Sequence, residues 1–183
     1  MNRSFLNKKT GLFFLLAGTL VMMVVMAKTG ATLKTAATPK GILDLEFAWN
    51  ATKTTNVVLA WTGIIPADNV LAAMVNTWLD FIFLFFYSLF LNKTCRMIAV
   101  KFTGFFSAAG RLVATGALVA GLLDVLENIG MLTSLNGHIS NTVSLLTVVF
   151  SITKWTLALA AVLYILVAGS SLLLKKTSNV TSL

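Results

Sequence analysis

The chain has 183 residues, of which 57% are hydrophobic and only 11% are charged, and its net charge is +8. This composition excludes an ordinary soluble domain and is typical of an integral membrane protein with a single domain. One cysteine and one histidine exclude an internal disulfide and argue against zinc or haem chemistry, so we expect no metal and no cofactor. No nucleic-acid-binding motif accompanies the positive charge, and we expect no nucleic-acid partner.

Four apolar runs are long enough, or nearly so, to cross a hydrocarbon core of about 30 Å, which needs about 20 helical residues. They predict helices near 11–27, 72–91, 104–133 and 143–174. A long loop over 28–71 follows the first helix, and short connections join the others. Because short connections make neighbouring helices antiparallel, the sequence predicts an all-α, up-down bundle of four transmembrane helices in one domain, 1–183.

The first apolar run, 11–27, has a second interpretation. It follows three basic residues and has the composition of a signal-peptide core, with Val25-Met26-Ala27 as an acceptable cleavage site. We interpret it as an uncleaved first helix.

Basic residues are distributed unequally between the two sides of the predicted bundle. Of the 14 lysines and arginines, nine lie near the N-terminus, near the connection between the second and third helices, or near the C-terminus. Four lie in the long loop, and all four tryptophans fall on that same side. Because cytoplasmic loops are rich in Lys and Arg and tryptophans anchor at membrane interfaces, both termini are predicted to be cytoplasmic.

The long loop contains a segment, 39–49, that is predicted to pack against the bundle. A proline and a glycine precede Ile42, Leu45 and Trp49, which follow one another at helical spacing. This pattern predicts a short amphipathic helix on the outer surface, with a loop packed on the bundle mouth as the alternative. In either arrangement we expect the segment to cover the outer end of the bundle and to place Glu46 near the buried charges.

Charged and amide side chains occur inside the predicted helices, although an ionised group at a bilayer centre costs about 2.5 to 3.5 kcal/mol. In the third helix a stripe of small and polar residues recurs at spacings of three and four: Gly110, Ala114, Ala117, Gly121, Asp124 and Asn128. Glu127 belongs to the adjacent row. Small residues let helices approach closely in lipid, so these polar groups are predicted to face the bundle interior.

The second and fourth helices bring complementary groups to a similar depth. The fourth helix carries Lys154 in a stripe of hydroxyl and small residues, and the second carries Asp80 and Tyr87 on one face. Asp80, Asp124 and Glu127 are therefore predicted to meet Lys154, three carboxylates for one ammonium. Such an excess of negative charge is not stable in a dry interior, so either a carboxyl binds a proton, or water, a cation or a ligand enters.

Four stretches follow one another in the chain: TPKGILDLEFAWN, NTWLDFIFLFFYSLF, DVLENIG and TKWTLALAAVLYIL. Together they resemble an uncharacterised family of small bacterial four-helix integral membrane proteins, over nearly the whole chain from the first helix onward. The resembling positions include Pro39, Gly41, Glu46, Asp80, Tyr87, Asp124, Glu127, Asn128 and Lys154. The resemblance implies a bacterial cytoplasmic (inner) membrane and supports the four-helix architecture, and it implies no activity.

Three interpretations of the buried polar groups stay open. They can fix the register of the helices without chemistry, bind a lipid, small ligand, ion or partner helix, or catalyse a reaction on a lipid-like substrate with Asp124 or Glu127 as acid or base. No nucleophile, metal set or cofactor motif accompanies the carboxylates, so we predict a non-enzymatic membrane component. A proton- or ion-conducting subunit is a further alternative, which would need an oligomer or larger partners.

The predicted site consists of seven residues: Glu46, Asp80, Tyr87, Asp124, Glu127, Asn128 and Lys154. The expected partners are membrane lipids, together with other membrane-protein subunits or further copies of this chain.

Overall fold

A computed structural model describes residues 3–62 and 69–178 of the chain. The helical elements in these two ranges are α1 (Arg3–Thr29), the short 3-10 helix η1 (Ala31–Leu33), α2 (Ile42–Glu46), α3 (Ala51–Thr62), α4 (Asn69–Ala99), α5 (Gly104–Leu135) and α6 (Asn141–Ser178). The described residues form no β-strand.

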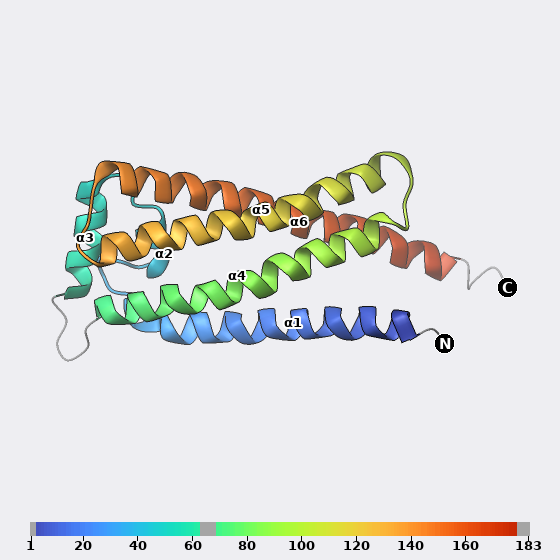
Figure 1. Cartoon of the computed structure of the whole chain (residues 1–183), viewed down its shortest axis with the longest axis horizontal. Coiled ribbons are helices and arrows are strands. Elements are labelled where there is room, and N and C mark those ends of the chain that lie inside the picture. The colour runs from blue at the N-terminus through green and yellow to red at the C-terminus, as the bar shows by residue number, and fades with distance from the viewer. Residues whose placement is uncertain (1–2, 63–68, 179–183) are drawn as a thin grey trace.

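Four of the described helices are long and apolar enough to cross a membrane. The spanning segments are Thr10–Thr29 of α1, Asn69–Ala99 of α4, Gly104–Leu135 of α5 and Asn141–Leu172 of α6. α1 packs against α4, α4 against α5, and α5 against α6, and the four helices extend along the long axis of the molecule (Figure 1). The prediction of an all-helical protein with four helices of membrane-spanning length is confirmed.

The two ends of the molecule differ in construction. Both chain termini and the connection between α4 and α5 lie at one end (Figure 1). α2, α3 and the connection 136–140 lie at the other end, which we call the cap end.

The connection between α5 and α6 has a glycine two residues beyond the end of α5. Gly137 has a φ of +88°, a left-handed conformation that favours glycine. The backbone N–H groups of Gly137 and His138 donate to the carbonyls of Ser134 (3.0 Å) and Thr133 (3.1 Å), which forms a Schellman motif. The Ser140 hydroxyl then accepts a hydrogen bond from the N–H of the third residue of α6 (3.2 Å) and caps that helix.

α4 is longer than predicted, because the stretch expected to be a basic loop continues the helix to Ala99. Leu91 and Cys95, four residues apart, are buried on one face and belong to the same apolar core as Ala161 and Tyr164 of α6. Burial of this face stabilises further helical turns, although the basic residues of the stretch are typical of a membrane-surface loop. α1, α5 and α6 also extend beyond their predicted ranges.

The segment between α1 and α4 was predicted to be a loop with one short helix. It contains the short helix α2 and, in addition, α3, a helix of 12 residues that was not predicted. The Asn50 side chain caps α3 by accepting a hydrogen bond from the Lys53 N–H (2.9 Å). Thr54 and Trp61 are buried, and Val57 lies partly buried between them. A capping residue followed by inward-facing positions at spacings of three and four is the signal that predicts such a helix.

An apolar core holds α2 and α3 on the cap end. Its buried members come from η1, α2 and α3 on one side and from α4 and α5 on the other: Leu33, Leu45, Trp61, Ala73, Met131 and Leu135. Trp61 is completely buried, and its indole N–H donates to the Leu33 carbonyl (3.0 Å) and to the Thr38 hydroxyl (3.1 Å). Of the apolar residues in the segment 39–49, Leu45 is only 2% exposed. Ala48 is 3% exposed, whereas Phe47 and Trp49 are 38% and 55% exposed, so this segment packs through Leu45 and Ala48.

Hydrogen bonds also tie α3 to α6. The Asn141 side-chain oxygen accepts from the Ala51 N–H (2.9 Å), and the hydroxyls of Thr54 and Ser144 are bonded at 2.7 Å. α3 is therefore held by both an apolar core and specific polar contacts.

We predict that Trp61→Phe lowers the stability of the protein by about 1 to 3 kcal/mol, because it removes two buried hydrogen bonds, to Leu33 and Thr38, of about 0.5 to 1.5 kcal/mol each. The measurement is unfolding of the purified protein in detergent micelles. Trp49→Phe is the matched control, because its ring is largely exposed, and it is expected to change stability little. Equal losses in the two variants would contradict the prediction.

Candidate functional site

Side chains from α2, α4, α5 and α6 form one polar cluster in the half of the bundle nearer the cap end. It contains four carboxyl groups, one ammonium, one phenol and one amide, contributed by Glu46, Asp80, Asp124, Glu127, Lys154, Tyr87 and Asn128. We call these seven residues the charged cluster. At a rise of 1.5 Å per residue, Lys154 lies about 20 Å from the start of α6.

The predicted small-residue face of α5 brings its members of the cluster inward. Gly110, Ala114, Ala117, Gly121, Asp124 and Asn128 are all buried. A side-chain Cβ at Gly121 would lie 2.9 Å from Ser88 of α4, so the absence of a side chain lets the two helices approach. This close packing places the polar residues of α5 against the neighbouring helices instead of lipid.

The Lys154 ammonium lies at the centre of the charged cluster. Its Nζ is 2.6 Å from Asp124 Oδ1, 2.8 Å from Glu127 Oε2 and 3.9 Å from Glu46 Oε2. The Lys154 side chain is 9% exposed, and those of Asp124 and Glu127 are 3% and 0% exposed. A buried ammonium is tolerated only when carboxylates or other acceptors replace its water shell, and here three carboxyl groups lie around it.

Asp124 is bonded through both of its carboxylate oxygens. Lys154 donates to Oδ1, and the Tyr87 hydroxyl donates to Oδ2 at 2.9 Å. Hydrogen bonds to an ionised acceptor are the strong class, so this pattern stabilises Asp124 as an anion.

Glu127 has a different environment. Its side chain is completely buried, and Oε2 lies at ion-pair distance from Lys154. Neither of its oxygens has a hydrogen-bond partner of acceptable geometry in the described structure. The contact with Lys154 is therefore electrostatic, and Oε1 is left without a donor.

Glu46 enters the cluster from α2. Its Oε2 accepts hydrogen bonds from the Ser151 hydroxyl (3.2 Å) and from the Trp155 indole N–H (3.3 Å). These bonds and the ion pair with Lys154 attach α2 to α6. The sequence indicated Trp155 only as an interface anchor, because no sequence pattern pairs a tryptophan with a carboxylate more than 100 positions away.

Asp80 joins the cluster through Asn128. The Asn128 amide donates to Asp80 Oδ2 at 2.8 Å, and Asn128 Oδ1 is buried without a partner. Among the described side chains, Asp80 is not one of the carboxyl groups within 4 Å of the Lys154 ammonium, so the expected direct pair is replaced by this amide contact. Asn128 lies one helical turn after Asp124 on α5, and at this position its amide reaches Asp80 of α4.

The charge of the cluster is unbalanced. When all five ionisable side chains other than Tyr87 are charged, they carry three more negative than positive charges. The described residues form no group of three or more His, Cys, Asp and Glu side chains placed to hold a metal ion. Lys154 itself occupies the position between the carboxylates.

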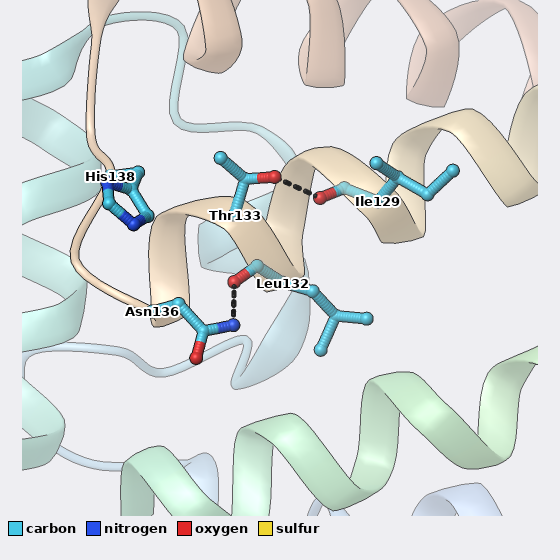
Figure 2. A pocket seen from close by; sticks show the side chains of 5 residues that line it. All are labelled: Ile129, Leu132, Thr133, Asn136 and His138. Atoms are coloured by element: carbon cyan, nitrogen blue, oxygen red, sulfur yellow. Dashed lines mark hydrogen bonds between the residues drawn. The ribbon is translucent and has the colours of Figure 1, made fainter.

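A second polar feature lies at the cap end of α5, where a surface hollow is lined by Ile129, Leu132, Thr133, Asn136 and His138 (Figure 2). The Thr133 hydroxyl donates to the Ile129 carbonyl (2.7 Å), and the Asn136 amide donates to the Leu132 carbonyl (2.8 Å). Both of these donors are thus satisfied within the helix. The hollow contains no carboxylate, lysine or arginine, and we assign the candidate site to the charged cluster instead.

No protein-family model matches the chain, and no curated protein or solved structure is significantly similar to it. The resemblance to small bacterial four-helix membrane proteins therefore stays a prediction, and the geometry of the cluster carries the functional argument.

We predict that Lys154→Met costs about 3 to 5 kcal/mol of stability, because it leaves buried carboxylates without their cation. Adding Asp124→Asn should recover part of this loss, with a coupling of about 0.5 to 3 kcal/mol measured by unfolding in micelles. The control pair is Lys154→Met with Asp44→Asn, because Asp44 bonds to the Lys40 N–H outside the cluster. Additive effects for both pairs would show that Lys154 and Asp124 are not coupled.

We also predict that Glu46 holds α2 in place. Glu46→Ala removes an ion pair and two hydrogen bonds, and amide hydrogen exchange in α2 should become at least about tenfold faster, since bonds to a charged group contribute about 1.5 to 3 kcal/mol. Glu46→Gln keeps an acceptor and should give an intermediate rate. Unchanged exchange in both variants would mean that the apolar core alone holds α2.

Proposed function

We propose that this chain is a non-enzymatic integral membrane component whose charged cluster binds a cationic group. The observation that carries the proposal is the gathering of four carboxyl groups in one cluster with a single ammonium: three contact Lys154, and Asp80 is linked through Asn128. Like charges repel strongly where the dielectric constant is low, so an added cation lowers the energy of the cluster and an added anion raises it. An inorganic cation and a protonated amine share the required chemistry.

Two unpartnered atoms support a binding role over a purely structural one. Glu127 Oε1 and Asn128 Oδ1 are both buried and lack hydrogen-bond partners. Both are acceptors, which a cation or an N–H donor would satisfy. A cluster that only fixed helix register would be expected to satisfy its own members.

A catalytic role has less support. Asp124 and Glu127, the two candidate acids or bases, contact the Lys154 ammonium and are 2% and 0% exposed. A general base must reach the proton that it removes, and these groups face Lys154 instead.

We infer that the four long helices form an up-down transmembrane bundle with both termini on the cytoplasmic side, in a bacterial inner membrane. The shared position of the two termini at one end supports this arrangement (Figure 1). The excess of lysine and arginine at that end supports the orientation. The cap end then lies at the outer surface, with α2 and the exposed rings of Phe47 and Trp49 near the headgroups as an amphipathic element.

Membrane lipids are the first proposed partners, because large apolar side chains of all four long helices are exposed. Other membrane-protein subunits or further copies of the chain can occupy parts of the same surface.

The predicted orientation is tested by cysteine labelling in intact cells, in a Cys95→Ser background. A cysteine at Thr52, which is exposed at the cap end, should react with a membrane-impermeant reagent, and a cysteine at Ser178 should react only after the membrane is opened. The reverse labelling pattern would show that the topology is inverted.

Cation binding is tested by thermal unfolding of the purified protein in a neutral detergent. We expect Na⁺, Ca²⁺ or ethanolammonium to raise the midpoint temperature of unfolding above that measured with a bulky tetraalkylammonium salt at equal ionic strength. A ligand present at 100 times its Kd stabilises the folded state by about 2.7 kcal/mol. The response should disappear in Asp80→Asn with Glu46→Gln and persist in Asp44→Asn. Native mass spectrometry identifies any bound amine or lipid. Identical responses in the two variants would place the effect outside the cluster.

A further inference from the structure

The four carboxyl groups of the charged cluster differ in the number of donors that they receive. Asp124 accepts from Lys154 and Tyr87. Glu46 accepts from Ser151 and Trp155. Each of these anions is therefore stabilised by two hydrogen bonds, which favour the charged form of a carboxyl group.

Asp80 accepts one hydrogen bond, from the Asn128 amide, and its side chain is partly exposed. Glu127 accepts none, and it is completely buried. Glu127 thus combines the greatest loss of hydration with the smallest number of donors among the four.

The surroundings of Glu127 supply more negative than positive charge. α5 contributes Asp124, α2 contributes Glu46, and α4 contributes Asp80 with the neutral phenol Tyr87. α6 contributes the one ammonium, Lys154, which Asp124 and Glu46 also contact. The attraction of Lys154 is shared among three carboxyl groups, so it does not compensate Glu127 alone.

We propose that Glu127 is a proton-binding site and that its side chain is a neutral carboxylic acid while the cluster is closed around Lys154. Oε2 then faces the ammonium at 2.8 Å as the oxygen of a neutral group, and Oε1 carries the proton. Burying an O–H group without a hydrogen-bond acceptor costs free energy, but burying a carboxylate oxygen without a donor costs more. The proton reduces the formal excess in the cluster from three negative charges to two.

This inference deepens the proposed function and rests on it for its consequence. When a cation enters the cluster, the O–H bond of Glu127 can break and release the proton to water, because the added positive charge stabilises the carboxylate. Cation uptake and proton release are then linked one for one at a single side chain.

The test uses the fact that Glu46 and Glu127 are the two glutamates of the chain. Protein labelled with ¹³C at the glutamate side-chain carboxyl is examined by solid-state NMR in lipid bilayers at neutral pH. We expect one signal of a protonated acid and one of a carboxylate. Glu46→Gln should remove the carboxylate signal and keep the acid signal.

Two carboxylate signals in the unaltered protein would overturn the proposal, and so would an acid signal that disappears in Glu46→Gln while a carboxylate signal persists. Glu127→Gln serves as a second variant that should lose the acid signal. These outcomes are separate from those of the cation assay. A protonated Glu127 without a cation response refutes the proposed function alone, and a cation response with an ionised Glu127 refutes this inference alone.

Discussion

The polar interior of the bundle depends on the ion pairs that the Lys154 ammonium forms. This ammonium is the positive charge in contact with Asp124, Glu127 and Glu46, and it connects α6 to α5 and to α2. Taking these groups out of water is expensive, and their attraction offsets that expense only while all of them stay in place. The attachment of α2 to α6 and the burial of Asp124 and Glu127 both depend on these contacts.

The sequence predicted the inward face of α5 and the gathering of carboxylates near Lys154 because spacing on a long helix determines which side chains share a face. Gly110, Ala114 and Gly121 are small for packing, and the polar residues follow the same stripe. The stop after Leu135 was also readable, because Gly137 adopts the left-handed conformation that ends a helix.

Other features depend on contacts between distant segments, which spacing does not encode. The extension of α4 to Ala99 depends on the apolar face of α6 that covers Cys95. The role of Asn128 as the link to Asp80 depends on how α5 packs against α4, and the bond from Trp155 to Glu46 depends on how α2 packs against α6. Asn50 did signal the start of α3, so that helix was within reach of the sequence.

The attachment of α1 carries a consequence for the order in which the protein is built. The Asn76 amide of α4 donates to the Met26 carbonyl (3.0 Å) and to the Thr29 hydroxyl (2.7 Å) in the last turn of α1. The Met26 carbonyl already accepts a hydrogen bond from the Gly30 N–H (2.9 Å), and Asn76, 50 residues later in the chain, adds a donor from another helix. During synthesis α1 therefore reaches the bilayer before these interhelical hydrogen bonds can form, and its docking becomes complete only when α4 is inserted beside it.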